Sequence, residues 1–314
     1  MSTVVIIGLG NIGSRHLEAV LKNESVVKTY CVDVAPPARA MPLADTDKII
    51  FVDSIERLPC RIDVAIISTP SAARFGVFSD LIKHSRVNYI VFEKVLFQKE
   101  EEYYKTEDLL RKNGVSAWVN CPRRISQSWI YIKERFENCS RVSFSCSGGR
   151  WGIACNAIHY LDFVQWLSGG ELVEINDIHI DGELVESKRS GYKEFFGLIT
   201  GQCGKNRPFA IECGNNAIPF EIELLSEDSR LRIVNDELEA QLISGDKETD
   251  VKRIDLEPVF VSHTTTVVLD DLLTKGTCDL PSYAESMSVH LEFIGKLMYE
   301  LEKRGVERGL CPIT

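Results

Sequence analysis

Short apolar runs and stretches with helical spacing alternate over the first 120 residues, and this alternation limits the possible fold more than any other feature of the chain. The apolar runs are rich in β-branched residues and contain few polar ones, as is typical of strands covered on both faces of a sheet. They occupy residues 3–7, 28–32, 63–67, 88–92 and 115–119. Strand, helix and strand in succession predict an α/β fold with a parallel, doubly wound sheet and right-handed crossovers.

The pattern changes after about residue 122. A helix is predicted over about residues 158–167, because apolar residues recur there at helical spacing and two glycines follow. Residues 174–253 alternate apolar and polar residues between turn residues such as Gly201, which is typical of antiparallel strands with one solvated face. We therefore expect a second, α+β domain with a large open, mainly antiparallel sheet over residues 121–314, after a first domain over residues 1–120.

A long amphipathic helix is predicted near the end of the sequence. Ser282 and Glu285 have the Ser-x-x-Glu spacing of a capping box, which marks a helix N-terminus. Apolar residues then recur on one face of the predicted helix, from Met287 to Leu301. His290 shares this face and is therefore expected to be a core histidine.

A glycine-rich turn directly follows the first predicted strand and opens a helix. Residues 8–13 read GLGNIG, and this context is the one in which GxGxxG predicts dinucleotide binding. Gly8 permits a tight turn, Gly10 lets backbone N–H groups approach a diphosphate, and Gly13 lets the helix pack closely on the strand. The phosphates would lie at the helix N-terminus, which favours an anion. Besides these glycines, the cofactor-binding candidates in the turn are Asn11 and Ile12.

Asp33 stands at the end of the second predicted strand, 20 residues beyond Gly13. A carboxylate at this place can accept hydrogen bonds from both hydroxyls of the adenosine ribose, and it would repel a 2′-phosphate. Val34 and Ala35 follow it, rather than Arg or Ser, so NAD is favoured over NADP. The alternative is a plain glycine turn with an unrelated aspartate.

A charged pair, Glu93 and Lys94, interrupts an apolar stretch immediately after the predicted strand 88–92. Ligands of an open α/β sheet bind outside the carboxyl ends of its strands, so Lys94 would lie at the reactive end of the cofactor. Its ammonium could hydrogen-bond a substrate hydroxyl and stabilise the alkoxide character that develops as hydride leaves. A local structural ion pair between Glu93 and Lys94 is the alternative.

Further candidate residues occupy the ends of predicted strands and the helix beyond: Ser68, Thr69, Pro70, Asn120, Arg123, Arg124, His159 and Asp162. Together with the glycine turn and the Glu-Lys pair, they resemble the Gfo/Idh/MocA oxidoreductases over nearly the whole chain. Members of that family are mostly NAD(P)-dependent dehydrogenases, reductases or epimerising enzymes that act on sugars, inositols and nucleotide sugars. The resemblance therefore implies a Rossmann domain that binds NAD, and a hydride-transfer activity on a substrate between the two domains.

The same resemblance implies roles for individual residues. Lys94 corresponds to the lysine of the family's Glu-Lys-Pro motif, and His159 to a histidine that acts as acid/base, which suits a side chain whose pKa lies near neutrality. Asp162, about one helical turn from His159, would orient the imidazole or be structural. Cofactor contacts are expected from Ser68, Thr69, Pro70, Glu93 and Lys94. Substrate contacts are expected from Arg123, Arg124, Trp151, Cys155 and Asn156, with surface exposure of the arginines and packing of the tryptophan as the alternatives.

Three positions depart from the family pattern. Val95 replaces the motif's proline, so the bend after Lys94 needs either a trans bond or a costly non-proline cis bond. Cys155 stands where the family usually has an aspartate, and Arg74 where many members have a histidine. A non-enzymatic NAD-binding sensor or partner protein is therefore the alternative to an active enzyme.

Composition restricts the partners further. The formal net charge of -10, with no Lys/Arg-rich run, argues against a nucleic acid or an anionic membrane as partner and leaves a small molecule. The ten cysteines are scattered without a CxxC pair, so no metal site is expected, and no segment has the length of a membrane span. We expect a cytoplasmic protein, and the resemblance implies a homodimer or homotetramer. Residues 155–159 and the terminal Cys-Pro-Ile-Thr resemble members that act on surface-polysaccharide sugars.

Overall fold

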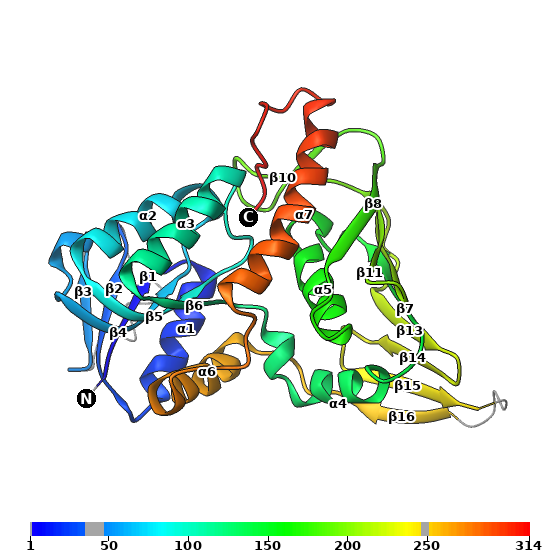
Figure 1. Cartoon of the computed structure of the whole chain (residues 1–314), viewed down its shortest axis with the longest axis horizontal. Helices are drawn as coiled ribbons and strands as arrows, with labels where there is room; N and C mark the ends of the chain where they lie inside the picture. The colour runs from blue at the N-terminus through cyan, green and yellow to red at the C-terminus, as the bar shows by residue number, and fades with distance from the viewer. Residues whose placement is uncertain (1, 35–46, 246–250) are drawn as a thin grey trace. The chain divides into compact units, whose positions relative to one another are not determined.

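The computed structural model describes residues 2–34, 47–245 and 251–314 (Figure 1). The chain forms two compact units, each made of two segments. The first unit comprises Met1–Ile125 and Val259–Ser286, and the second comprises Ser126–Pro258 and Met287–Thr314. Ala35, named above as evidence on cofactor preference, lies outside the described residues.

The sequence-based division gave every residue after 120 to the second domain. In the structure, the segment Val259–Ser286 belongs to the first unit. Its helix α6 (Val261–Lys275) packs against α1 (Asn11–Lys22) in the first unit. Three apolar side chains of α6 complete a buried core on that face of the sheet: Val268, Leu269 and Leu272. The chain therefore returns to the first unit because α6 covers apolar surface that the sheet and α1 leave uncovered.

The first unit contains a six-stranded parallel sheet, which confirms the predicted doubly wound fold. Its strands, in spatial order, are β3 (Ile49–Val52), β2 (Val26–Val32), β1 (Ser2–Ile7), β4 (Arg61–Ile67), β5 (Arg86–Phe92) and β6 (Ser116–Val119). The order reverses between β1 and β4, and the crevice outside such a reversal is where ligands of open α/β sheets bind. Strand β3 was not predicted.

Helices cover both faces of this sheet. Helices α1 and α6 lie along one face, and α2 (Ser71–His84) and α3 (Glu100–Asn113) along the other (Figure 1). The last four residues of β1, from Val4 to Ile7, are all buried because the two layers take alternate side chains. On the α2 face, for example, the rings of Phe78 and Phe92 lie 5.3 Å apart. The continuous apolar runs of the sequence follow from this double cover.

The second unit is built around an eight-stranded sheet. Its strands, in spatial order, are β16 (Val251–Asp255), β15 (Glu239–Ser244), β14 (Ser229–Val234), β13 (Glu221–Ser226), β7 (Val142–Gly149), β12 (Arg207–Gly214), β11 (Gly197–Cys203) and β8 (Val173–Ile180). All neighbours pair antiparallel except β7 and β12, so the expected mainly antiparallel sheet is confirmed. Helix α5 (Ile153–Leu167) packs on it, α4 (Gln127–Phe136) precedes it, and β9 (Val185–Glu186) and β10 (Lys193–Glu194) form a separate hairpin.

Gly201 is a correction to the predicted turns, since it lies inside β11, where the pairing with β8 shifts register. A Cβ atom at this position would lie 2.2 Å from the carbonyl oxygen of Glu174 and 2.5 Å from the ring of Phe209. The glycine is therefore required by close approach of neighbouring strands and not by a turn.

Both predicted helix-end signals are confirmed. After α5, Gly169 and Gly170 have φ values of 80° and 95°, the left-handed conformation that ends many helices. At the start of α7 (Tyr283–Glu302), the hydroxyl of Ser282 lies 2.7 Å from a carboxylate oxygen of Glu285, and the Glu285 N–H donates to that hydroxyl. Among the described residues, no helix is both long and apolar enough to cross a membrane.

Candidate functional site

Two glycines of the turn after β1 have steric reasons to be glycine. Gly8 has a φ of 90°, and a Cβ atom on it would lie 2.9 Å from the backbone nitrogen of Thr69. A Cβ atom on Gly13 would lie 1.9 Å from the carbonyl oxygen of Gly8. The turn can therefore form, and α1 can approach it, only with glycine at both places.

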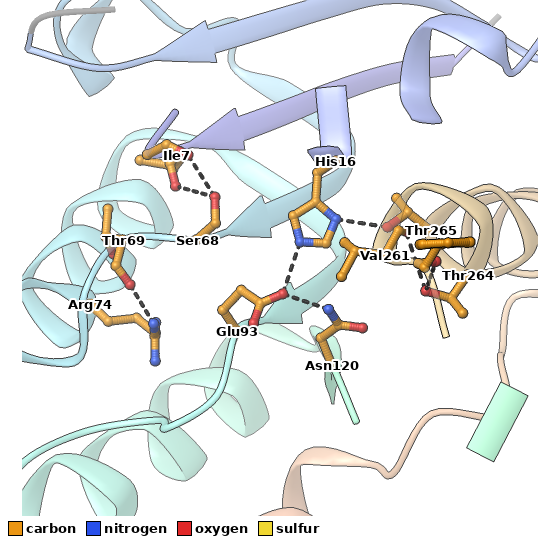
Figure 2. A network of polar contacts seen from close by, with 12 residues as sticks. Ile7, His16, Ser68, Thr69, Arg74, Glu93, Asn120, Val261, Thr264 and Thr265 are labelled. Atoms are coloured by element: carbon orange, nitrogen blue, oxygen red, sulfur yellow. Dashed lines mark hydrogen bonds and ion pairs between the residues drawn. The ribbon is translucent and has the colours of Figure 1, made fainter. Parts of the chain in front are cut away.

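Hydroxyl groups hold this turn in place. Ser68, which follows β4, donates from Oγ to the carbonyl oxygens of Ile7 at 3.2 Å and Gly8 at 2.7 Å (Figure 2). On the other side Ser14 donates to the carbonyl oxygen of Leu9 at 3.0 Å. Ser14 was not singled out in the sequence, because its partner becomes evident only when the turn folds back over the helix.

The N-terminus of α1 fits a diphosphate. Gly10 is the N-cap residue and has no side chain to cap the helix, so the N–H groups of the first turn depend on another acceptor. No atom lies within 4 Å of a Cβ built on Gly10, and both Gly10 and Asn11 are exposed. This open space beside a positive helix end suits a phosphate anion.

Asp33 lies where the sequence predicted it, directly after β2 at the same edge of the sheet. Its Oδ2 accepts a hydrogen bond of 2.7 Å from the backbone N–H of Leu9, inside the glycine turn. The carboxylate is thereby fixed next to the turn, and the following Val34 is 91% exposed. A carboxylate in this place fits a ribose diol and would repel a phosphate.

The residues that follow the strands are tied to one another across the edge of the sheet. Backbone hydrogen bonds run from Gly8 N–H to Val32 at 2.9 Å, from Ser68 N–H to Ile7 at 2.9 Å, from Glu93 N–H to Ile67 at 3.0 Å, and from Asn120 N–H to Phe92 at 2.8 Å. The segments that follow β1, β4, β5 and β6 therefore lie side by side at the carboxyl end of the sheet, where the sequence predicted a cofactor.

Glu93 is the centre of a buried polar network (Figure 2). Its Oε1 lies 2.9 Å from Nε2 of His16 on α1 and 2.5 Å from Nδ2 of Asn120 after β6. Nδ1 of His16 lies 2.8 Å from the hydroxyl of Thr265 on α6. His16 and Glu93 are only 1% and 7% exposed. Sequence reasoning gave His16 no more than a packing or capping role, since its partners lie 77 and 249 positions away.

The carboxylate of Glu93 stays ionised despite its burial. Burial is the largest influence and raises its pKa, but the hydrogen bond and charge of His16, the hydrogen bond from Asn120 and the charge of Lys94 together hold the pKa below its usual value. The hydrogen-bond partners of Glu93 are thus His16 and Asn120, while Lys94 acts on it through charge. This pattern differs from the local Glu93–Lys94 ion pair that the sequence left open.

The segment after Lys94 is fixed by an arginine. The Lys94–Val95 peptide bond is cis, which decides between the two alternatives that the missing proline raised. Arg74, on α2 and only 1% exposed, donates through Nη1 to the carbonyl oxygens of Val95 and Leu96, and through Nη2 to that of Thr69. Arg74, which stands where many family members have a histidine, therefore joins the segments that follow β4 and β5.

In the second unit, α5 carries His159, Asp162, Cys155 and Asn156. His159 is partly exposed and Asp162 is buried. The backbone N–H of Cys155 donates to Glu194 on β10 at 3.1 Å, and the amide of Asn156 donates to the carbonyl oxygen of Trp151 at 2.9 Å. Asn156 thus holds the start of its own helix.

Trp151 lies among other aromatic rings of the second unit. Its ring centroid is 5.7 Å from that of Tyr160 and 5.1 Å from that of Phe220. The indole N–H donates to the carbonyl oxygen of Glu212 at 2.8 Å. These contacts favour the packing role over a sugar-stacking one.

The two arginines after β6 differ in their surroundings. Arg124 is buried and donates to Glu285 at 3.1 Å, so it is not the solvated surface arginine of the alternative interpretation. Arg123, in the same short helix η3 (Pro122–Ile125), is half-buried. Within the part of the chain that the structure describes, no group of three or more His, Cys, Asp or Glu side chains could hold a metal ion.

Fold and site together define a Rossmann-type, dinucleotide-binding domain. Residues 2–121 match the family model GFO_IDH_MocA, described as an oxidoreductase family with an NAD-binding Rossmann fold. This match covers the N-terminal, NAD-binding domain, and it confirms the resemblance named above over that part of the chain. A comparison with curated proteins gives no match.

Solved structures share the fold over both units. The UDP-N-acetylglucosamine 3-dehydrogenase GnnA from Acidithiobacillus ferrooxidans has a TM-score of 0.71 and 12% identity, covering 94% of this chain and 96% of that one. An Agrobacterium radiobacter oxidoreductase in complex with NAD+, L-tartaric acid and magnesium has a TM-score of 0.74 and 13% identity, covering 97% of both chains. A super-repressor mutant of Gal80p from Saccharomyces cerevisiae has a TM-score of 0.75 and 14% identity, covering 97% of both. At such identities the likeness establishes the fold alone.

Proposed function

We propose that the protein is an NAD-dependent oxidoreductase that moves a hydride between the cofactor and a hydroxyl-bearing or keto carbon of a sugar, an inositol or a nucleotide sugar. The observation that carries this proposal is the position of Lys94. It lies one residue beyond Glu93, which directly follows β5, at the edge of the sheet that also carries the glycine turn and Asp33. The reactive lysine and the cofactor-binding residues thus belong to one rigid unit.

The residues present fit NAD better than NADP. Backbone N–H groups of the glycine turn would bind the diphosphate, and the Asp33 carboxylate would accept the ribose hydroxyls. Ser68, Thr69 and Pro70 follow β4 beside the turn, where they would contact the bound dinucleotide. When bound, NAD supplies the hydride acceptor and NADH the donor.

Lys94 and His159 perform the proton and charge steps. The Lys94 ammonium donates a hydrogen bond to the substrate oxygen and favours the alkoxide that forms when hydride leaves the adjoining carbon. The His159 imidazole accepts the hydroxyl proton in oxidation and returns it in reduction, a contribution typically worth about 10² to 10⁴ in rate. Asp162, buried on the same helix, keeps the helix and the imidazole in place.

A nucleotide sugar is the substrate class we favour. The proposal is supported by the shared fold with a UDP-sugar dehydrogenase. Arg123 is half-buried in the short helix η3, after β6. It would bind a diphosphate or a carboxylate of the substrate. The proposed assembly is a homodimer or homotetramer, and the proposed location is the cytoplasm.

Absorbance of the reduced nicotinamide tests the proposal directly. The purified protein is mixed with NAD or NADH and a panel of sugars, inositols and nucleotide sugars in both directions of reaction. We expect turnover with at least one nucleotide sugar, a loss of at least about 10²-fold in kcat in Lys94→Ala and in His159→Ala, and unchanged NADH affinity in His159→Ala. Turnover that survives Lys94→Ala would contradict the proposed role of this lysine.

A non-catalytic NAD-binding protein is the second candidate. It is supported by Cys155 at the family's aspartate position and by the shared fold with Gal80p, a protein whose mutant is described as a super-repressor. Tight NADH binding without turnover on any member of the panel, together with no effect of Lys94→Ala, would favour it. Restoring the family residue with Cys155→Asp then separates a lost active site from one adapted to another substrate.

A further inference from the structure

The network around Glu93 joins three elements that are distant in sequence. The hydroxyl of Thr265 on α6, the imidazole of His16 on α1 and the carboxylate of Glu93 after β5 form a continuous hydrogen-bonded line, and Asn120 adds a second donor to Glu93 (Figure 2). We propose that His16 is a positioning residue that links the phosphate-binding turn of α1 to Lys94. The inference rests on the proposed function of Lys94.

The chemistry of Glu93 determines which nitrogen of His16 must carry a proton. An ionised carboxylate can only accept, so Nε2 of His16 carries the proton and donates to Glu93. Nδ1 lies 2.8 Å from the hydroxyl of Thr265, which can donate to the ring or accept from it, so this contact holds the other side of the imidazole. The hydroxyls of the neighbouring Thr264 and Thr266 donate to backbone carbonyl groups, whereas that of Thr265 contacts the imidazole.

Helix α1 connects this network to the glycine turn. His16 lies six residues after Gly10, or about 9 Å along an α-helix. The helix start that would receive the diphosphate and the side chain that holds Glu93 therefore move as one rigid element. Displacement of the turn on binding a dinucleotide would be transmitted to Glu93, and a shift of Glu93 would change NADH affinity.

Lys94 is held from both sides along the chain. On its N-terminal side, Glu93 is fixed by His16 and Asn120. On its C-terminal side, the carbonyl groups of Val95 and Leu96 are fixed by Arg74. A displacement of about 1 Å at a reacting group can cost about 10² in rate, so the precision of this arrangement matters to catalysis.

Substitutions on α6 test the link without touching the cofactor site. Thr265→Val removes the hydroxyl and keeps the shape, and Thr265→Ser restores a hydroxyl. Thr266→Val is the matched control, since its hydroxyl bonds to the Ser262 carbonyl oxygen at 3.1 Å and not to the network. His16→Gln keeps a donor for Glu93 but not the imidazole.

Three readouts are independent of turnover. They are the NADH dissociation constant by fluorescence, the imidazole ¹⁵N spectrum of His16, and the rate at which an amine reagent modifies Lys94, followed by mass spectrometry. In Thr265→Val we expect NADH affinity to fall about three- to tenfold, the factor for one neutral hydrogen bond, with faster modification of Lys94. Thr265→Ser and Thr266→Val should stay within about twofold of the parent protein, and the parent spectrum should show a proton on Nε2 of His16.

The inference fails if Thr265→Val and His16→Gln lower the melting temperature but leave NADH affinity and Lys94 modification unchanged, since His16 would then only stabilise the fold. An Nε2 without a proton would also overturn it, because Glu93 would then receive no hydrogen bond from the imidazole. A parent protein that turns over no substrate would refute the proposed function, yet these three readouts would still test the link.

Discussion

Nη1 of Arg74 lies 2.9 Å from the carbonyl oxygen of Leu96, so a fully buried guanidinium ties α2 to the segment that contains Lys94. The same side chain also satisfies the carbonyl groups of Val95 and Thr69. Burial of an arginine costs desolvation free energy. This cost is offset only when its N–H groups find acceptors such as main-chain carbonyl oxygens. Its position next to Lys94 suggests that this cost is tolerated for placement of the lysine.

Removal of this side chain should therefore affect both stability and the site. Arg74→Met keeps much of the volume but leaves three buried carbonyl groups without their donor, and we expect a loss of about 2–4 kcal/mol in the free energy of unfolding. Urea titration checks this value. Arg57→Met is the control, because Arg57 forms an exposed pair with Asp53 and should change stability by less than about 0.5 kcal/mol.

Two glycines of the turn should respond differently to the same methyl group. Gly13→Ala places a Cβ 1.9 Å from the Gly8 carbonyl oxygen, so the backbone must shift, and we expect a loss of at least about 1–3 kcal/mol of stability together with weak NADH binding. Gly10→Ala meets no atom within 4 Å, so its melting temperature should stay unchanged. Its methyl group would nevertheless occupy the place of the diphosphate. NADH titration should show at least about tenfold weaker binding in Gly10→Ala, and unchanged binding would contradict the assigned phosphate site.

Asp33 should determine the preference between the two dinucleotides. Its carboxylate is fixed by the Leu9 N–H and would repel a 2′-phosphate. In Asp33→Asn the repulsion disappears, so the ratio of the NADPH and NADH dissociation constants should fall by about tenfold, corresponding to about 1.4 kcal/mol. Fluorescence titration with both cofactors measures this ratio. A ratio that does not change would show that the adenosine ribose lies elsewhere.

Local patterns predicted the first unit well because they have local causes. The strands around Val5 and Ile66 are buried on both faces and so leave apolar runs, and Gly8 and Gly13 meet steric limits set within a few residues and by one adjoining strand. Such features depend on residues that are close together in the sequence, so a local pattern can predict them. The confirmed capping box of Ser282 has the same origin.

Arg74 and His16 could not be assigned by the same reasoning. Each is a polar side chain on an amphipathic helix, and its partners come from other elements: Val95 and Leu96 for Arg74, and Thr265 for His16. The return of α6 to the first unit was missed for the same reason, since only tertiary packing reveals which surface an amphipathic helix covers. Buried polar networks are specified by distant positions, which a single sequence does not connect.

Acid stability should depend on Glu227, which lies in the turn between β13 and β14. The backbone of the turn itself, followed by the N–H and hydroxyl of Ser140, holds its pKa at about 2, below the ordinary 4.5. A depressed carboxyl pKa stabilises the folded state above about pH 4.5, and this stabilisation is lost as the pH falls towards 2. The melting temperature of Glu227→Gln should therefore lie below that of the parent at pH 7 and approach it at pH 2–3. Ser140→Ala, which removes one donor, should reduce the same difference in part.

The start of α5, which carries Cys155 and His159, depends on a carboxylate from another element. Glu194 on β10 accepts the N–H of Ala154 at 2.9 Å and that of Cys155 at 3.1 Å, so it neutralises the positive end of the helix from outside. Glu194→Ala should reduce the free energy of unfolding by about 1–2 kcal/mol and increase amide exchange at Ala154 and Cys155. In the neighbouring β9, Glu186→Gln removes only an exposed pair with Lys193 and should leave both quantities unchanged. Equal exchange in the two variants would mean that α5 forms without this cap.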